Sequence, residues 1–381
     1  MTYSVFVRVI VVGAGVIGAA IADALATRGA DVTVLDMRSP GRGASQASAG
    51  VLAPFTEASG KTALFELCAR SLALYDSFLA SLAERSGREI EHVRNGTVEV
   101  ALSAEEAGRL KSAHAWLTDH DISCQWLEPA ELRMWEPSVA PSAVGALAIP
   151  SQGFVNVPAM VGALVQSARL AGATFISQVE ALEVIPFRDH ADVRAGAERY
   201  SADRVVIAAG SWSKRVRIAN LPALPVHPIR GQLLHLRWNR GPMPTRVIWG
   251  HDCYTVPWHD GTLLVGATVE DVGFDEASTV DGVRQLTTSV ARLIPDAQHA
   301  ALAGVRVGLR PATSDGLPLI GPLTAAPTVT MATGHYRNGI LLTPLTAQLV
   351  AASVLDDAAD PLLAATTPDR FIRPIAHGAR I

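Results

Sequence analysis

Cysteine is scarce in this chain. Only Cys68, Cys124 and Cys253 occur among its 381 residues, and they are odd in number and far apart. Such a set forms neither the disulfide framework of a small secreted domain nor a zinc site with regularly spaced ligands. We therefore expect a protein of a reducing compartment, the cytoplasm, with no metal site.

Lysine and excess positive charge are scarce as well. The lysines are Lys61, Lys111 and Lys214, the formal net charge is −4 and the pI is near 6.3. A slightly acidic balance argues against a nucleic-acid-binding surface or a polybasic membrane patch. None of the three lysines lies in the motifs described below, so a Schiff-base lysine is not expected.

Long uninterrupted apolar runs are also absent. The most apolar stretch, VFVRVIVVGAGVIGAAIADALA at residues 5–26, is interrupted by Arg8 and Asp23. No other stretch reaches the ~18 apolar residues that a membrane-spanning helix needs, so we expect no integral membrane association. The hydrophobic fraction of 49% still provides for a sizeable core, which excludes a disordered or fibrous chain.

A glycine-rich turn follows the first β-branched run. Residues 7–12 are expected to form a strand buried in a parallel sheet, followed by Gly13, Gly15 and Gly18, a helical stripe, and a second strand ending at Asp36. In this order the glycines permit a tight turn, close approach of a pyrophosphate, and close packing of helix on strand. Asp36 is placed to accept from a ribose hydroxyl. The pattern predicts a dinucleotide site, and a packing turn without ligand is the alternative.

Other segments favour FAD over a nicotinamide cofactor. VVIAAG at 205–210 and VTMATG at 329–334 are further strands that end in small residues. The C-terminal part is therefore expected to return to the N-terminal unit, as in proteins whose chain wraps a long, buried FAD. The small, polar segment 43–50, GASQASAG, suits a position along a flavin, although a flexible loop is the other interpretation. A helix is expected to begin near Thr343-Pro344, with Thr343 as its N-cap.

The middle of the chain has a different pattern. Between about 226 and 270 the expected strands are longer and alternate, and Asp260-Gly261 separates two of them as a hairpin turn would. We predict the class α/β + α+β, with a discontinuous Rossmann-like FAD-binding domain and a second, mostly antiparallel β-sheet substrate domain. The predicted ranges are 1–90, 150–222 and 305–381 for the first domain, and 91–149 and 223–304 for the second.

Five motifs carry a family resemblance. They are GRGASQASAGVLAP (41–54), RGQLL (230–234), YTVP…DG…LLVGAT (254–268), GLRPATSDGLPLIG (308–321) and ATGHYRNGILLTP (332–344). In order and spacing, from about residue 7 to about 357, the chain resembles the glycine oxidases of the thiamine pathway, within the D-amino-acid oxidase family of FAD-dependent oxidoreductases. The resemblance implies a flavoprotein that oxidises a small amine and reduces O2 to hydrogen peroxide.

The resemblance also assigns roles by position. Arg310 would clamp the substrate carboxylate, Tyr254 would offer it a hydroxyl, and Arg337 would lie beside the substrate. The backbone from His335 to Leu341 would wrap the isoalloxazine ring. Together with the glycine motif, the implied FAD-binding positions are Gly13, Gly15, Val16, Ile17, Gly18, Asp36, Met37, Ala44, Ser45, Ala49, Gly50, Val51, Val179, Gly210, His335, Tyr336, Arg337, Asn338, Gly339, Ile340 and Leu341.

Physical chemistry supports the clamp independently. A guanidinium is planar and forked, so it holds a carboxylate through two parallel hydrogen bonds. Gly308, Pro311 and the Asp315-Gly316 pair predict an irregular turn around Arg310, where a charged residue is more often functional than structural. A structural salt bridge is the alternative for Arg310, and ordinary strand packing is the alternative for Tyr254.

Three positions depart from the family pattern. Asp36 stands where flavoenzymes often carry Glu, Trp258 follows YTVP at a commonly basic position, and Val269 replaces a residue that is methionine in at least one relative. These changes leave the chemistry intact but leave the substrate open. It is glycine, a small N-substituted glycine such as sarcosine or another N-alkylglycine, or a small D-amino acid.

We therefore predict an FAD-dependent amine oxidase that acts on a small amino acid and O2, as a homo-oligomer. Sarcosine-oxidase relatives tether flavin to a cysteine near the C-terminus, and no cysteine follows Cys253, so the FAD is expected to be non-covalent. The alternatives are a D-amino-acid oxidase, a D-amino-acid dehydrogenase that reduces a quinone, and a nucleotide-binding module without catalysis.

Overall fold

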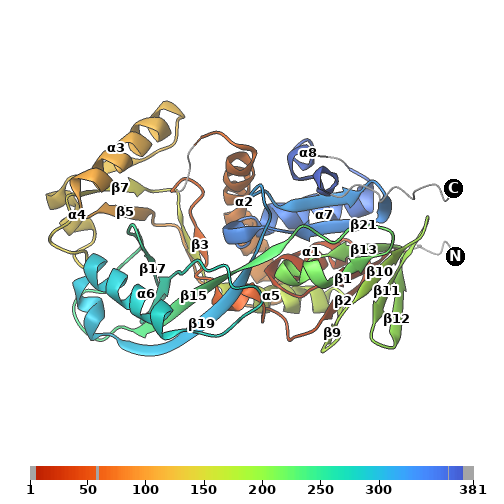
Figure 1. The fold of residues 1–381 in the computed structure, drawn as a ribbon. Coiled ribbons are helices and arrows are strands. Elements are labelled where there is room, and N and C mark those ends of the chain that lie inside the picture. The colour runs from red at the N-terminus through yellow and green to blue at the C-terminus, as the bar shows by residue number, and fades with distance from the viewer. Residues whose placement is uncertain (1–5, 57–59, 359, 372–381) are drawn as a thin grey trace, which may run out of the picture.

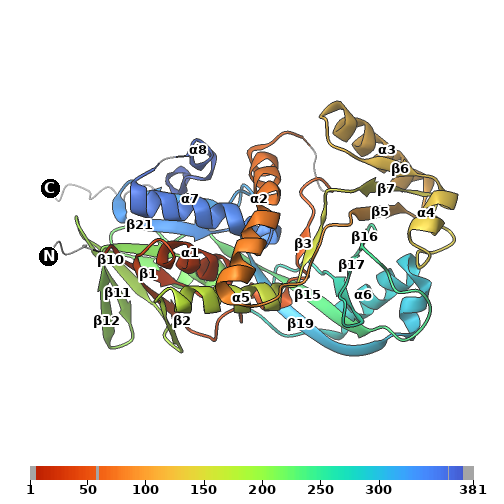
Figure 2. The same ribbon diagram turned by 180° about the vertical axis from the view of Figure 1, so that it is seen from behind.

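The structure is a computed structural model that describes residues 6–56, 60–358 and 360–371. Figures 1 and 2 show an elongated molecule with a helix-covered sheet at one end and a second sheet at the other. The long strands β15 (His227–Arg237) and β19 (Ala301–Ala312) run between the two ends. Within the described residues, no helix is both long enough and apolar enough to cross a bilayer.

A six-stranded sheet forms the first end, in the order β20-β21-β13-β1-β2-β9. Its neighbouring strands are parallel except for the antiparallel pair β20 and β21. The strands are β1 (Arg8–Val12), β2 (Asp31–Asp36), β9 (Thr174–Ser177), β13 (Arg204–Ile207), β20 (Leu319–Leu323) and β21 (Ala326–Thr333). Strands far apart in sequence thus lie side by side, and the predicted discontinuous Rossmann-like fold is confirmed.

Both faces of this sheet are covered, which explains why its central strands are β-branched runs. One face packs with a cluster from α1 (Val16–Ala26), α2 (Ala63–Ser86), α5 (Val157–Leu170) and α7 (Thr343–Asp356). The other face packs on a small sheet in the order β12-β11-β10-β14. Its strands are β10 (Glu183–Pro186), β11 (Ala191–Ala195), β12 (Glu198–Ala202) and β14 (Arg217–Ile218).

An eight-stranded sheet forms the second end, in the order β19-β15-β18-β17-β16-β5-β7-β6. Only the β16–β5 pair is parallel, so the sheet is mostly antiparallel, as predicted. Its shorter strands are β5 (Thr97–Ala101), β6 (Gln125–Leu127), β7 (Gly145–Ile149), β16 (Val247–Trp249), β17 (Tyr254–Pro257) and β18 (Thr262–Gly266). The elements α3 (Ala104–Asp119), α4 (Pro129–Trp135), α6 (Val280–Leu293) and η3 (Pro295–His299) pack around it.

Short elements link these parts. A small sheet in the order β3-β8-β4 joins β3 (Val51–Leu52), β4 (His92–Val93) and β8 (Gly153–Val155). The remaining turns of helix are η1 (Ala44–Ala47), η2 (Gly210–Arg215), η4 (Tyr336–Asn338), α8 (Leu363–Thr366) and η5 (Pro368–Arg370). The predicted domain boundaries stay a prediction, and β19 runs across the one at residue 305.

Two local expectations were wrong. Arg310 lies in the regular strand β19, not in an irregular turn. β19 is the edge strand of its sheet. Proline is tolerated there because the backbone on one side of an edge strand forms no hydrogen bonds to a neighbouring strand. Thr343 is the first residue of α7 and not its N-cap, which is Leu342. The Thr343 hydroxyl instead donates to the carbonyl of Gly339 at 2.8 Å, because the chain already turns helically before it.

Candidate active site

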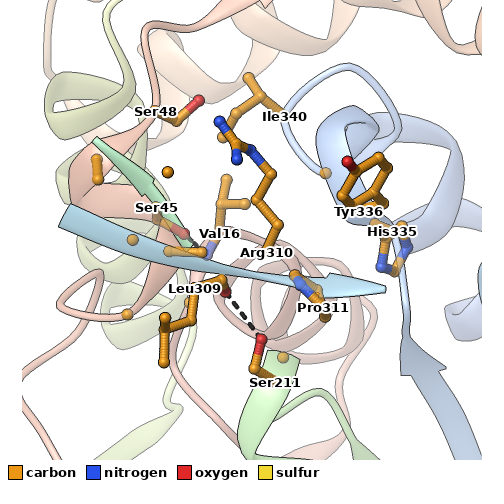
Figure 3. Close-up of a pocket in the computed structure, with 18 of the residues that line it drawn as sticks. Val16, Ser45, Ser48, Ser211, Leu309, Arg310, Pro311, His335, Tyr336 and Ile340 are labelled. Carbon is orange, nitrogen blue, oxygen red and sulfur yellow. Dashed lines mark hydrogen bonds between the residues drawn. The ribbon is translucent and has the colours of Figure 1, made fainter. Parts of the chain in front are cut away.

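A cavity of about 520 Å3 lies where the carboxyl ends of β1, β2, β13 and β21 meet the strands β15, β18 and β19. Parallel sheets commonly bind ligands at this edge. Every candidate residue from the sequence lines this cavity except Gly18. Figure 3 shows part of the lining, which comes from segments more than 300 residues apart in the chain.

The glycine turn opens the cavity at the start of α1. Gly13 has φ +108°, and a Cβ there would stand 2.5 Å from the carbonyl oxygen of Ala208. A Cβ on Gly18 would stand 1.9 Å from the carbonyl oxygen of Gly13, which explains why Gly18 serves the packing and stays outside the lining. Helix N-termini favour anions, so the turn fits the pyrophosphate of an FAD.

Asp36 lies at the end of β2, beside this turn. Its carboxylate accepts hydrogen bonds from the backbone N–H of Ala14 at 2.6 Å and of Arg38 at 2.7 Å. Burial raises the pKa of Asp36 above its usual value, and the two amide bonds act in the opposite direction. A fixed carboxylate next to a phosphate-binding turn is the usual partner of a ribose hydroxyl, so Asp36 fits the role expected for it.

The segment 43–50 forms a second wall. The Ser45 hydroxyl accepts from the N–H of Val16 at 3.0 Å and so ties this segment to α1. Gly50 has φ +79°, and a Cβ there would stand 1.8 Å from the carbonyl oxygen of Val155. On β19, a Cβ at Gly308 would stand 2.9 Å from the Cβ of Ala47. The small residues are needed for close packing, so the segment is a built wall and not a loose loop.

The segment 335–341 forms the opposite wall and is fixed from behind. The Tyr75 hydroxyl donates to the carbonyl of Ile340 at 2.5 Å, and the Ser71 hydroxyl donates to the carbonyl of Leu341 at 2.7 Å. His335 is 4% exposed and lies 3.1 Å from the Thr346 hydroxyl through Nε2. Burial lowers the pKa of His335 to about 3, so its ring is neutral and structural at neutral pH.

Arg310 extends from β19 toward Ile340 and away from Ser211 (Figure 3). Its Nη1 donates to the carbonyls of Thr268 at 2.9 Å and Arg230 at 3.3 Å. A Cβ on Gly231 would stand 2.3 Å from Nη2 of Arg310. The glycine at position 231 therefore provides the space in which the guanidinium lies.

Tyr254 and Arg337 line the same cavity. Tyr254 of β17 is opposite Gly266 of β18, and a Cβ on Gly266 would stand 2.6 Å from the Tyr254 hydroxyl. The guanidinium carbon of Arg337 is 5.3 Å from the ring centre of Tyr336. The structure thus brings together all three residues assigned to the substrate.

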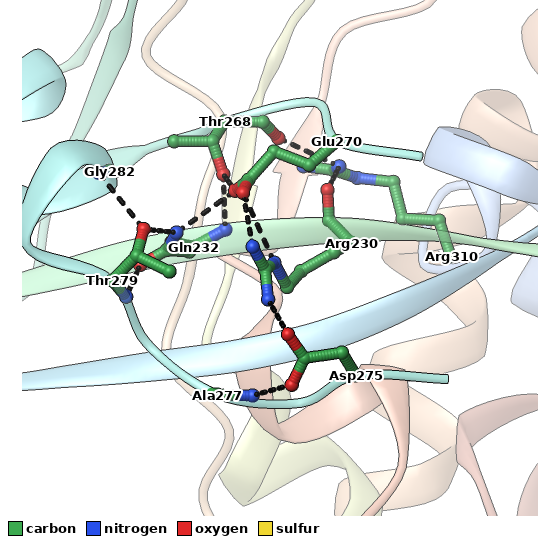
Figure 4. A network of polar contacts seen from close by, with 9 residues as sticks. All are labelled: Arg230, Gln232, Thr268, Glu270, Asp275, Ala277, Thr279, Gly282 and Arg310. Carbon is green, nitrogen blue, oxygen red and sulfur yellow. Dashed lines mark hydrogen bonds and ion pairs between the residues drawn. The ribbon is translucent and has the colours of Figure 1, made fainter. Parts of the chain in front are cut away.

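A partly buried polar network lies behind Arg310 (Figure 4). Arg230 is 4% exposed and donates to Glu270 and Asp275, each at 2.5 Å. Glu270 also accepts from the Thr268 hydroxyl at 2.6 Å and from the Gln232 amide at 2.9 Å. Burial opposes ionisation of Glu270, but these donors win and lower its pKa. The two carbonyls that accept from Arg310 belong to residues of this network.

Sequence reasoning missed several lining residues. Trp212, Trp249 and Arg215 line the cavity, but a lone tryptophan or arginine carries no sequence signal for a site. Of the departures from the family pattern at Trp258 and Val269, only Val269 is among the described residues that line the cavity. Trp258 is outside the lining, and its ring centre is 6.0 Å from that of His235.

Comparisons with known proteins agree with this geometry. The family model "FAD dependent oxidoreductase" matches residues 8–353. The glycine oxidase of Geobacillus kaustophilus is 36% identical over 90% of this chain and 91% of its own. The bifunctional protein ThiO/ThiG of Nostoc sp. is 34% identical over 93% of this chain but 54% of its own, so the chain spans about half of that relative.

Solved structures are similar over nearly the whole length. The crystal structure of glycine oxidase from Geobacillus kaustophilus has a TM-score of 0.90 at 34% identity and covers 95% of this chain and 98% of its own. The glycine oxidase from Bacillus cereus has a TM-score of 0.87 at 27% identity and covers 94% and 97%. The described fold is therefore the fold of these enzymes.

Proposed function

Because the chain belongs to the family of FAD-dependent oxidoreductases and is an FAD-dependent amino-acid oxidase, we propose that glycine or a small N-substituted glycine is its substrate. The observation that carries this proposal is Arg310, whose guanidinium lies in the same cavity as the glycine turn and Asp36. A carboxylate held there presents its α-carbon inside a cavity built for FAD. A bound FAD would supply the hydride acceptor for this oxidation and the means of reducing O2 to hydrogen peroxide.

In this proposal, the residues of this chain position the substrate. Arg310 would bind the carboxylate through its fork, and Tyr254 would donate its hydroxyl to the same group. Fixed carbonyls at residues 230 and 268 hold one side of the guanidinium. The released imine would hydrolyse to glyoxylate and ammonia when the substrate is glycine, or would serve thiazole formation in thiamine synthesis.

A histidine or carboxylate base is not part of this mechanism, because the lone pair of the neutral amine drives hydride loss. The rate should then rise with pH as the bound ammonium loses its proton. His251 and Asp252 line the cavity beside Tyr254. We expect His251→Gln and Asp252→Asn to keep the rise in kcat/KM between acidic and alkaline pH. A flat profile in either FAD-loaded variant would establish a protein base.

The FAD is expected to be non-covalent. Cys253 is the one cysteine that lines the cavity in the described part of the chain, and burial raises the pKa of its thiol to about 12. The thiol therefore stays protonated and is a poor nucleophile. Acid precipitation should leave all yellow colour in the supernatant, as FAD. Flavin that pellets with the protein would contradict this.

A substrate screen tests the proposal directly. Glycine, sarcosine, longer N-alkylglycines and D-alanine should be compared at saturation with peroxide as the readout. Peroxide formed fastest with glycine or an N-alkylglycine supports the proposal, and D-alanine as the best substrate would favour a D-amino-acid oxidase. Flavin reduction without peroxide would favour a quinone-linked dehydrogenase. The homo-oligomer and the cytoplasmic location expected from the sequence stay predictions.

A further inference from the structure

A second cavity, of about 750 Å3, runs along α5, the helix in front of β1 and β2 in Figure 2. Its floor is apolar and includes Val157, Pro158, Val161 and Val165. Its edges carry four arginines, and no aspartate or glutamate is among the described residues that line it. We call this cavity the arginine groove, after Arg42, Arg88, Arg169 and Arg306.

Among the residues that the structure describes, no acidic side chain pairs with the arginines of this groove. Other surface arginines pair with acids, such as Arg28 with Asp356 at 2.8 Å and Arg38 with Glu276 at 2.6 Å. Within residues 6–56, 60–358 and 360–371, none of the four groove arginines forms an ion pair. Four cations therefore line one cavity that has no acidic residue in its described lining, an arrangement that attracts a negatively charged ligand.

Arg42 and Arg306 form the part of the groove that is most favourable for an anion. Arg306 is partly buried, and its Nη1 donates to the carbonyl of Gln46 at 3.1 Å. Burial and the nearby positive charge of Arg42 lower the pKa of Arg306. Because both side chains line the same cavity, an anion between them would offset the repulsion of their like charges.

The chemistry of the groove selects the class of ligand. One guanidinium fork uses both oxygens of a carboxylate, whereas the three terminal oxygens and two charges of a phosphate monoester serve two forks. The apolar floor beside the forks fits an organic body, as in typical ligand sites. We propose that the arginine groove binds a small organic phosphate monoester, with its phosphate between Arg42 and Arg306 and its apolar part on α5.

Calorimetric titration of the FAD-loaded full chain tests this site. The probes are phenyl phosphate, inorganic phosphate and benzoate. Phenyl phosphate should bind one to one, and more tightly than the other two by about tenfold. Its affinity should fall by about a hundredfold in the double variant Arg42→Gln/Arg306→Gln, since each charged hydrogen-bonding partner contributes roughly tenfold. Arg133→Gln removes an exposed arginine of α4 and should change nothing.

Two further variants test whether the phosphate binds in the arginine groove and not in the first cavity. Binding should persist in Arg310→Ala, which removes one of the arginines that line the first cavity. Arg42→Glu changes an exposed side chain and should abolish binding without loss of flavin or of thermal stability, even where the double variant folds poorly. Unchanged affinity in Arg42→Glu would overturn the site, as would binding that Arg310→Ala removes. Equal affinity for phenyl phosphate, inorganic phosphate and benzoate would overturn the ligand class.

Discussion

Arg310→Ala is expected to lower kcat/KM by roughly two to four decades, or ~3–5 kcal/mol of transition-state stabilisation. If Arg310 binds the substrate as proposed, the change would remove a charge-assisted fork and leave the substrate carboxylate without that partner. Arg310→Lys should recover only part of the loss, because an ammonium cannot reproduce the fork. Flavin occupancy should change little, because the role proposed for Arg310 is in binding the substrate and not in the walls that would hold FAD.

The variant Gly231→Ala tests whether the position of the Arg310 guanidinium matters as well as its charge. The new methyl would stand 2.3 Å from Nη2 of Arg310 and would displace the fork while keeping the cation. An intermediate loss in kcat/KM is expected, with flavin content retained. Stopped-flow flavin reduction and flavin absorbance of each variant provide the measurement.

Near-normal kcat/KM in a fully flavin-loaded Arg310→Ala protein would show that Arg310 does not bind the substrate carboxylate.

Gly13→Ala is expected to destabilise the protein by about 3 kcal/mol or more and to empty it of flavin. Two costs add at this position. The φ of +108° is strained for any side chain, and the Cβ would stand 2.5 Å from the Ala208 carbonyl oxygen. That oxygen is backbone, so relief requires β13 to move away from β1.

Gly29→Ala is the matched control for that prediction. Gly13 precedes helix α1 and Gly29 follows it. Gly29 has φ +88°, but a Cβ there would meet nothing within 4 Å. Its cost should be that of the dihedral alone, about 1 kcal/mol, with normal flavin content. Urea unfolding and the flavin-to-protein absorbance ratio decide the matter. Equal behaviour of the two variants would disprove the steric role of the Gly13 turn.

Local sequence signals predicted the elements that depend on local chemistry. The β-branched run before Gly13, the glycine spacing and Asp36 identified the βαβ unit, and Asp260-Gly261 identified the hairpin between β17 and β18. These features carry their structural requirement in neighbouring residues. The family resemblance then indicated the remaining walls of the cavity, which short-range patterns alone do not reveal.

Tertiary context decided the rest. Gly308 and Pro311 wrongly indicated a turn. Glycine and proline are common in turns, and the sequence does not show which residues pack against them in the fold. Gly308 instead allows Ala47 to pack against β19, and Pro311 is tolerated at a sheet edge. Trp212 and Trp249 likewise reach the cavity only through the fold. The Arg230–Glu270 pair joins residues 40 apart, and nothing local marks it as the support of Arg310.

The strand order of the six-stranded sheet has a consequence for how the protein is made on the ribosome. β13 pairs with β1 on one side and with β21 on the other, and β21 ends at Thr333. The nascent chain therefore carries an open sheet edge until β21 has been synthesised, and it lacks the 335–341 wall until residue 341 has been added. Such long-range pairing slows folding and leaves the edge open to aggregation. Because residues of the 335–341 wall line the cavity, we expect FAD to bind only after this segment has been synthesised.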